Sequence, residues 1–488
     1  MSSKEDERVE EGLLRKKLIT GAKWATALRI ASQSLSWVVT LIMVRLLAPH
    51  DYGLNAMIEV PIELLMLFST MGIDAAIIRY GQKNAEQLSA VFGFLLLING
   101  IFFLALLFSA GQIAAYFNEP QLAGLLQATA VVFVLAPFRT IPNALLDMAL
   151  DFKLKSQVEL SATIVASLVS LVLAALGAGV WALVAAILLN AIVRAALLAY
   201  LRPWVLRPTL RLAPIRDLLK YGMVIIAGGA IAVIGGKMVN MLAGPILGTE
   251  TLGFFAVASV FAMLPMSKVM PIVHQTMFPA FAKLHAQPEQ IKIYILKSLE
   301  LASVVIFPLT IGMSVVADQL VPIIFGERWQ PIALPLAILS AMSIFRLINQ
   351  IFNGPLNATG NASLVLKMQV LILLIFSIGA IPASAFGLMG LVILSVMSIV
   401  VQLLMTLIIC VRIFNILIFD IFLAIRAALF SVLIMASILI FIKWYVNYNT
   451  PSFIYLILIV GLGALIYLCC LFLIFKEKYN ELISIFNK

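Results

Sequence analysis

Polar and charged side chains inside long apolar segments are the residues of this sequence that could do chemistry. In the first segment, five of them recur at spacings of three and four residues: Thr26, Arg29, Gln33, Ser36 and Thr40. These spacings place the five side chains on one face of a helix. Arg29 lies roughly 15 Å into that helix at a rise of 1.5 Å per residue. A guanidinium at this depth needs a wet cavity or a carboxylate partner. We therefore expect Arg29 and Gln33 to line a cavity, whereas helix packing is the alternative for the Ser and Thr positions.

A second candidate is the glycine-rich segment near residue 235. Lys237 directly follows Gly235 and Gly236, and Asn240 lies on the same helical face as Gly236. Glycine inside a helix favours bending, so this pattern predicts a gate that carries a cation into the cavity. The alternative is close helix packing through small residues. A buried lysine could also exchange protons.

Further charges fall within apolar segments: Arg45, Glu59, Glu63, Asp74, Glu159, Arg194, Glu300 and Arg346. Arg45 and Glu59 flank one turn, and we expect them to form a structural ion pair. Arg346 has amide side chains nearby, at Asn349, Gln350 and Asn353, which favours a wet surface. With Arg29 and Lys237, this predicts a cationic interior suited to an anionic substrate such as a phosphate, a pyrophosphate or an acidic sugar.

Signals of enzymes and metal sites are weak in this sequence. The three histidines stand singly, the three cysteines lie in apolar runs, and no phosphate-binding glycine loop is found. We expect no metal, no cofactor, no disulfide and no enzymatic activity.

The segments that must position these residues are those of a membrane protein. Of the 488 residues, 63% are hydrophobic and 11% are charged, and the mean hydropathy is +1.10. Apolar runs of about 20 residues match the bilayer core, where the backbone must bond within helices or a closed barrel. We expect an all-α polytopic membrane protein with about 14 spanning helices, at 19–47, 54–78, 88–110, 122–145, 157–176, 180–201, 218–246, 253–275, 293–317, 331–352, 363–383, 388–411, 417–444 and 452–475.

Lys and Arg gather in every second connection between these segments, although the net charge of +10 could by itself suggest nucleic acid. Basic residues spaced in this way orient membrane helices. The pattern predicts that both termini are cytoplasmic, in the inner membrane, and gives no reason to expect a nucleic acid partner. The connections on the other side are short, which favours a transporter.

An internal repeat is predicted at an offset of 200 residues, where 46–53 aligns with 246–253. Because each half has six helices, the two halves would be parallel repeats about an axis along the membrane normal. The predicted organisation is an N-terminal lobe (1–201), a basic cytoplasmic linker (202–217), a C-terminal lobe (218–411) and two further helices with a tail (412–488). A central cavity between two lobes suits alternating access.

Four short motifs resemble those of the polysaccharide (Wzx-type) flippases in the multidrug, oligosaccharidyl-lipid and polysaccharide exporter superfamily. They are Val44-Arg45-Leu46-Leu47-Ala48-Pro49-His50-Asp51-Tyr52-Gly53, Phe278-Pro279-Ala280-Phe281-Ala282-Lys283, Gly326-Glu327-Arg328-Trp329-Gln330-Pro331 and Asn357-Ala358-Thr359-Gly360. All four are loop motifs, so none identifies a substrate residue.

The resemblance implies a flippase that moves a lipid-diphosphate-linked oligosaccharide across the membrane, for lipopolysaccharide or another surface polysaccharide. Its partners would be that substrate, membrane lipids and the polysaccharide polymerase machinery. Two alternatives remain. A cation-coupled multidrug exporter of the same superfamily should favour anionic or aromatic cavity groups, and a membrane-embedded glycosyltransferase or polymerase should have a large polar loop.

Overall fold

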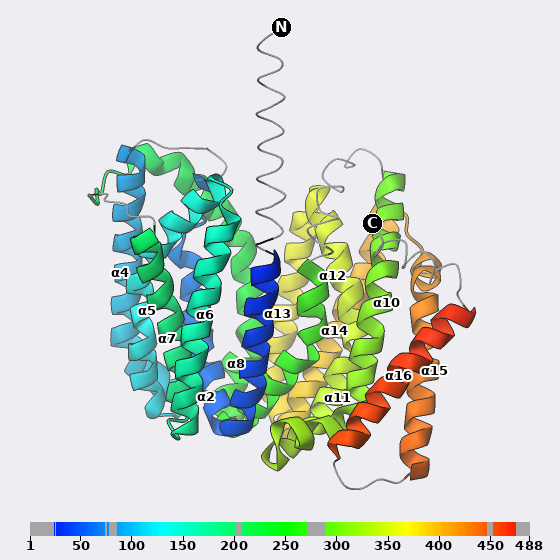
Figure 1. Ribbon diagram of the computed structural model, residues 1–488. Coiled ribbons are helices and arrows are strands. Elements are labelled where there is room, and N and C mark those ends of the chain that lie inside the picture. Colours follow the sequence, from blue (N-terminus) through cyan, green and yellow to red (C-terminus); the bar gives the residue numbers. More distant parts are fainter. Residues whose placement is uncertain are drawn as a thin grey trace. The chain divides into compact units, whose positions relative to one another are not determined.

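The computed structural model describes residues 24, 26–73, 76–77, 85–201, 207–271, 273, 288–446 and 452–474. Within these ranges every element of regular secondary structure is a helix (Figure 1). Among the described residues, twelve helices are long and apolar enough to cross a membrane, or up to thirteen with the bent pair Glu327–Ala341 and Ser343–Asn357 as one span. The predicted class, an all-α polytopic membrane protein, is confirmed.

The helices follow the apolar segments closely. The first covers Thr26–Leu46. The others are α2 (Pro49–Ser69), α4 (Ala85–Phe117), α5 (Gln121–Met148), α6 (Phe152–Ala175), α7 (Val180–Leu201), α8 (Arg216–Ala262), α10 (Pro288–Leu320), α11 (Ala333–Ala341), α12 (Ser343–Ala358), α13 (Ala362–Ser384), α14 (Gly387–Phe414), α15 (Ile418–Val446) and α16 (Phe453–Ile474), with short turns η1 (Ala213–Ile215), η2 (Val321–Phe325) and η3 (Glu327–Ile332).

The two helices expected at 218–246 and 253–275 are joined in α8, which is broken at Gly248, where φ is 79° and ψ is 167°. This break lies between the two expected segments. A residue with a side chain is strained at such a positive φ, so glycine is favoured at this break. With the two parts of α8 counted separately and α11 and α12 counted as one bent span, the described helices correspond to the fourteen predicted segments.

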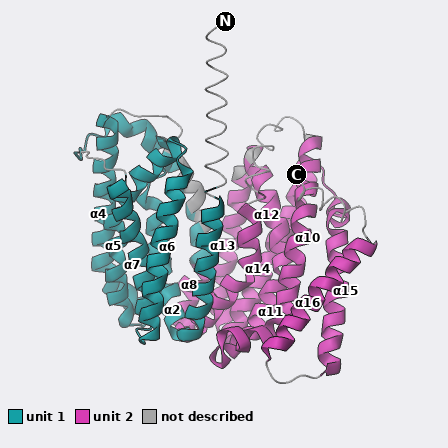
Figure 2. Ribbon diagram, viewed as in Figure 1, with its two compact units in different colours: residues 1–237 teal, residues 238–488 magenta. Residues whose placement is uncertain are grey.

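The chain divides into two compact units, Met1–Lys237 and Met238–Lys488 (Figure 2). The division falls inside α8 and not in the predicted linker 202–217. One reason is that the start of α8 packs tightly in unit 1, where a Cβ on Gly222 would collide with the carbonyl oxygen of Met71. The predicted division into lobes at 201 and 218 stays a prediction.

The two units have similar internal packing, each considered by itself. In unit 1, α4 packs on α5, α6 on α7, and α5 on α7. In unit 2, α10 packs on α11 and α12, α13 on α14, and α12 on α14. Both α4 and α10 are 33 residues long. The chain also breaks at Ala48, an extended residue before α2, and at Gly248, which are 200 residues apart. These regularities favour the predicted repeat.

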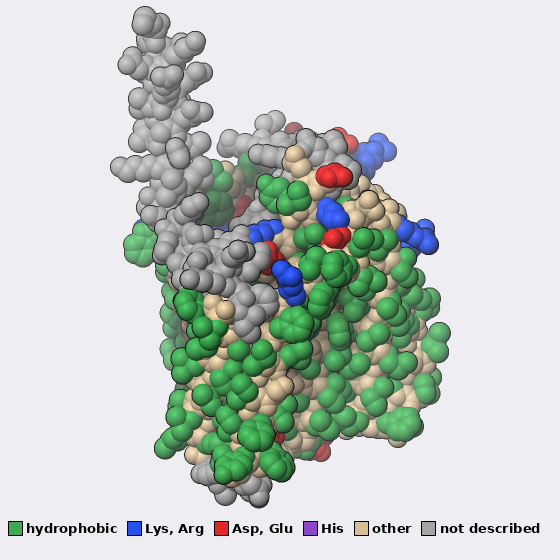
Figure 3. All heavy atoms as spheres, turned by 90° about the vertical axis from the view of Figure 1, so that its right-hand side faces the viewer, with side chains coloured by type: hydrophobic (Ala, Val, Ile, Leu, Met, Phe, Trp, Pro, Cys, Tyr) green, Lys and Arg blue, Asp and Glu red, His purple; other side chains and the backbone are tan. Residues whose placement is uncertain are grey.

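Contacts at the helix ends show that successive connections alternate between two ends of unit 1. At one end His50 lies 3.7 Å from Glu119, and Asp51 accepts a hydrogen bond from the backbone of Val180. At the other end Lys155 pairs with Asp147. The connection between α5 and α6 therefore lies opposite to those that hold His50, Glu119 and Val180. The face in Figure 3 is the right-hand side of Figure 1, where unit 2 lies, and its Lys and Arg side chains gather near one end of a broad hydrophobic surface.

In unit 2, ion pairs join α10 and α15 at both of their ends. Lys292 Nζ lies 2.6 Å from Asp420 Oδ2, and Lys443 Nζ lies 2.6 Å from Asp318 Oδ1. Residues early in both helices meet, and residues late in both helices meet, so α10 and α15 run parallel. Between two parallel membrane helices, the chain must cross the membrane an odd number of times. Helices α13 and α14 account for two crossings, so the bent pair α11 and α12 accounts for one and forms a single broken span.

Candidate functional site

An ion triad joins the middle of α2 to α8 within unit 1. Lys237 Nζ lies 2.7 Å from Glu59 Oε2 and 2.8 Å from Glu63 Oε1. Asn55 Nδ2 donates a 2.8 Å hydrogen bond to the other carboxylate oxygen of Glu59. We call Glu59, Glu63 and Lys237 the α2–α8 triad.

Helix geometry explains why these groups meet. Asn55, Glu59 and Glu63 are four residues apart, so they share one face of α2. Glu59 lies eleven positions after the break at Ala48, and Lys237 lies eleven positions before the break at Gly248. At 1.5 Å per residue each lies about 16 Å from its break, which is close to half of the hydrocarbon thickness.

The charges of the triad do not cancel, since two carboxylates face one ammonium. The lysine side chain is 19% exposed, and those of Glu59 and Glu63 are 38% and 48% exposed. Lys237 is therefore neutralised, while the site as a whole carries an excess of carboxylate. Such an arrangement can accept a cation or a donor group, and it adds no net positive charge to the interior.

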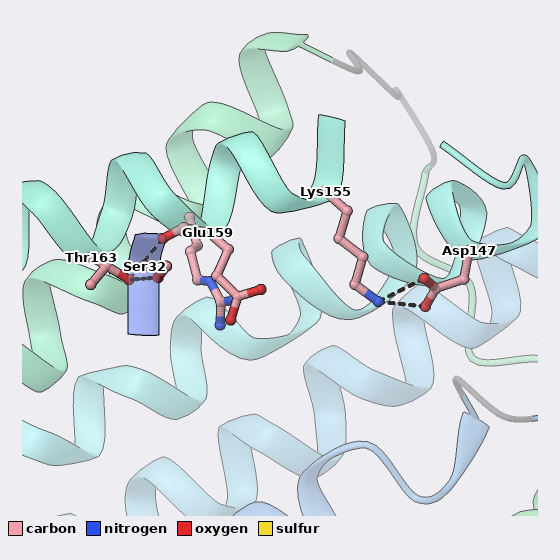
Figure 4. A network of polar contacts seen from close by, with 6 residues as sticks. Ser32, Asp147, Lys155, Glu159 and Thr163 are labelled. Atoms are coloured by element: carbon pink, nitrogen blue, oxygen red, sulfur yellow. Dashed lines mark hydrogen bonds and ion pairs between the residues drawn. The ribbon is translucent and has the colours of Figure 1, made fainter. Parts of the chain in front are cut away.

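The structure places the predicted polar face of the first helix away from the core of unit 1. Val39 and Met43 pack in a cluster with Ala174 and Ala182 of α6 and α7. Ser32 belongs to this buried side and donates a 3.1 Å hydrogen bond to Thr163 of α6 (Figure 4).

Arg29 and Gln33 point the other way and are exposed in the structure. Among the described residues, Arg29 has no hydrogen bond and no carboxylate partner. Its predicted position on a cavity wall stays a prediction.

Two further ion pairs of unit 1 involve α6, one within the membrane-spanning segments and one at a helix end. Arg194 of α7 lies 3.1 Å from Glu159, one turn before Thr163. Lys155 donates to both carboxylate oxygens of Asp147, at 2.6 and 2.7 Å (Figure 4). These pairs join helices that pack together, so a structural role explains them.

The remaining predicted site residues are spread over both units. Asn240 is half-buried three residues after Lys237 on α8. Arg346 is half-buried on α12, one turn before the buried Asn349. A Cβ on Gly235 or Gly236 would meet nothing within 4 Å, so close backbone packing does not explain these glycines. The helix continues through both of them and breaks at Gly248. Their gating role, like the binding roles of Asn240 and Arg346, stays a prediction.

The sequence-based interpretation missed Lys237 as the partner of Glu59. It paired Glu59 with Arg45 because both flank the first turn, but Arg45 is only three residues from Ala48. The carboxylate of Glu59 accepts from Lys237 and Asn55, and the predicted pairing of Glu59 with Arg45 stays a prediction. Equal distance from the two breaks was the signal that could have identified this pair.

The first loop motif has a structural role that the atoms explain. Asp51 Oδ2 accepts from the backbone of Ala48 at 2.9 Å, and Oδ1 accepts from that of Val180 at 2.9 Å. One carboxylate therefore fastens the start of α7 to the start of α2. Negative charge at a helix N-terminus is also electrostatically favourable.

Two more of the motifs lie at breaks in unit 2. Trp329 is fully buried and makes an edge contact with Phe254, with ring centroids 5.9 Å apart. Gly326 ends η2 and Gly360 follows α12, and their φ values are 96° and 81°. The motif at 278–283 lies outside the described residues. The described motifs therefore mark turns of the fold.

Fold and site together define a polytopic helical membrane protein with charged groups held at mid-membrane depth. Residues 42–334 match the family described as "Polysaccharide biosynthesis protein", and the chain belongs to that family. The membership predicted from the loop motifs is thereby confirmed.

Individual proteins agree with this assignment. The chain is similar to the lipopolysaccharide biosynthesis protein WzxC of Escherichia coli K12, with 27% identity over 376 residues, covering 77% of this chain and 76% of WzxC. The lipid II flippase MurJ in an inward closed conformation has a similar fold, with a TM-score of 0.74, 13% identity, and coverage of 93% and 99% of the two chains. An inward-facing multidrug resistance MATE transporter matches with a TM-score of 0.61, 15% identity, and coverage of 78% and 96%.

Proposed function

We propose that this protein is a flippase for a lipid-diphosphate-linked oligosaccharide, used in the synthesis of a surface polysaccharide. The observation that carries the proposal is membership of the polysaccharide biosynthesis family, in a chain whose helices span a membrane. The similar protein WzxC is named for lipopolysaccharide biosynthesis, and the similar fold of MurJ belongs to a lipid II flippase. Movement of a finished lipid-linked unit across the bilayer is a task in such a synthesis that suits a helical membrane protein.

Arg29 is the residue that we propose to bind the diphosphate. Its guanidinium lies in a spanning helix, is exposed, and has no carboxylate partner among the described residues. A planar guanidinium can bind phosphate oxygens with two parallel hydrogen bonds. Gln33, one turn further, would supply an amide to the same ligand. The oligosaccharide would require further polar groups, for which Arg346 and Asn240 are our candidates in the predicted central cavity.

Transport would proceed by alternating access of the two predicted lobes, with both termini in the cytoplasm and the polymerase machinery receiving the product. Excess of Lys and Arg in alternate connections supports this orientation. The proposal assigns no covalent chemistry to the chain.

The decisive experiment removes the gene and follows lipid-linked repeat units. We expect these units to accumulate on the cytoplasmic side while the surface polysaccharide disappears. In a second experiment, purified protein is placed in vesicles that contain a fluorescent lipid-diphosphate oligosaccharide. The protein should move this lipid from the inner to the outer leaflet, where a membrane-impermeant reductant removes its fluorescence. Normal surface polysaccharide in the deletion strain, together with no flipping in vesicles, would refute the proposal.

One observation favours a second function, cation-coupled export of drugs. The α2–α8 triad has two carboxylates for one lysine, an arrangement that suits a cationic compound. The same deletion strain separates the two functions: hypersensitivity to cationic drugs with intact polysaccharide would indicate the exporter.

A further inference from the structure

The described part of the connection between α7 and α8, residues 207–215, is held against α4 by hydrogen bonds. The backbone amide of Thr209 donates to the carbonyl oxygen of Ser89 at 3.1 Å, and Gln87 Nε2 donates to the carbonyl oxygen of Pro214 at 3.3 Å. A Cβ on Gly93 would collide with the carbonyl oxygen of Thr209, so only glycine allows this close approach. The described part of the connection is therefore a fixed element of unit 1.

One side of this connection is anchored in the core. Ile215 and Leu218 are 0% and 3% exposed, and they pack in a cluster with Val91 and Leu95 of α4. The anchor explains how an irregular segment can hold a defined position at the helix ends.

The opposite side carries exposed apolar and basic residues in close succession. Leu210 and Leu212 are 64% and 49% exposed. Around them the exposed basic residues are Arg207, Arg211, Arg216 and Lys220, while the same segment contains a single acid, Asp217. We call residues 207–220 the basic foot.

Among the described residues, the basic foot is poorly neutralised. Arg211 lies 3.7 Å from Glu86, and both side chains are largely exposed, at 78% and 64%. Such a contact stabilises little in water. Arg207, Arg216 and Lys220 have no ion pair with any residue that the structure describes. The foot therefore offers positive charge to something outside the protein.

The depth of the basic foot identifies the kind of partner. It lies beside the first turns of α4, a helix of 33 residues. Such a helix is about 50 Å long and exceeds the ~30 Å hydrocarbon region, so we expect these first turns to lie near the level where that region ends. Exposed leucines at that level can enter the headgroup region, and flanking Arg and Lys attract anionic headgroups. A soluble partner would leave the leucines' position at the bilayer surface unexplained.

We propose that the basic foot binds anionic phospholipid headgroups and gathers them around the connection between α7 and α8. Leu210 and Leu212 insert among the lipids, and the four basic side chains bind their phosphates. The site is independent of the proposed flippase function, because it uses none of the residues assigned to the oligosaccharide.

The test measures which lipids contact the foot in the full-length protein. A fluorophore is attached at Leu210→Cys, with the three native cysteines replaced by alanine, in vesicles of phosphatidylcholine with a minor fraction of phosphatidylglycerol. In parallel samples a quenching nitroxide is carried either by phosphatidylglycerol or by phosphatidylcholine. We expect quenching per labelled lipid to be roughly threefold or more stronger for phosphatidylglycerol.

The matched variants remove two charges each. In the variant Arg207→Gln/Arg216→Gln, quenching by labelled phosphatidylglycerol should fall towards that by labelled phosphatidylcholine. Lys367→Gln/Arg412→Gln removes two exposed charges of unit 2 and should leave it unchanged. Equal quenching by both lipids in the unaltered foot would overturn the proposal, and so would an equal loss of preference in the two variants. Quenching by neither lipid would also overturn it, by placing the foot away from the bilayer.

Discussion

At the scale of single residues, Arg29 allows the sharpest test of substrate binding. Arg29→Ala should lower the initial rate of flipping at least about tenfold, which corresponds to one lost hydrogen-bonded charge contact. Arg29→Lys should restore part of the rate, because an ammonium keeps the charge but not the planar pair of donors. The rate is measured in vesicles at matched protein amounts.

The control for Arg29 is Ser34→Ala, which alters another exposed side chain of the same helix. It should flip at the normal rate. A normal rate for Arg29→Ala would show that the guanidinium contributes nothing to transport.

The α2–α8 triad gives a prediction about stability. Lys237→Met leaves two carboxylates one helical turn apart without their shared cation, and should cost about 1–3 kcal/mol because the groups are only partly buried. We expect the melting temperature in detergent to fall by several degrees. The triple variant Glu59→Gln/Glu63→Gln/Lys237→Met removes all three charges and should recover most of the loss.

Activity of the triple variant separates two roles of the triad. A stable variant that no longer flips would indicate a part in transport, whereas normal flipping would indicate a structural part. If Lys237→Met alone unfolds at the normal temperature, the triad does not stabilise unit 1.

At the scale of elements, each of the two ion pairs between α10 and α15 should stabilise the packing of these helices independently of the other. Lys292→Asp should lower the melting temperature, because it places two carboxylates together at Asp420. The exchanged pair Lys292→Asp/Asp420→Lys should restore it. The same comparison is made at the other end of the helices with Lys443→Asp and the exchanged pair Lys443→Asp/Asp318→Lys. At this end Lys443 also donates to the carbonyl oxygen of Val315 at 2.8 Å. Failure of both exchanges to restore stability would mean that the contacts are incidental.

Most helix positions could be predicted because lipid imposes the length and composition of each segment. The break in α8 at Gly248 lies between two predicted segments, whereas Gly235 and Gly236 permit a bend that nothing in their surroundings requires. The site was predicted only in part. Arg29 was found from its depth and Lys237 from the two glycines before it, whereas the pairing of Lys237 with Glu59 and Glu63 depends on which helices pack together.

At the scale of the whole molecule, the orientation in the membrane can be tested directly. Single cysteines are introduced at Glu119, between α4 and α5, and at Arg211, in the basic connection between α7 and α8. The proposed orientation places these two connections on opposite sides of the membrane. In intact cells, an impermeant thiol reagent should label position 119 and should not label position 211. A permeant reagent should label both, as a control for accessibility. Labelling of position 211 from outside would reverse the proposed orientation.

The pairing of α10 with α15 also has a consequence for biosynthesis. Lys292 and Asp318 are synthesised 128 and 125 residues before their partners Asp420 and Lys443. During that interval α10 holds two charges whose final partners do not exist. A truncated chain that ends before α15 would leave the charges of Lys292 and Asp318 without these partners. We expect such a chain to be retained by insertion chaperones or degraded by membrane proteases. We therefore expect α15 to complete the charge pairing of α10 late in the assembly of unit 2.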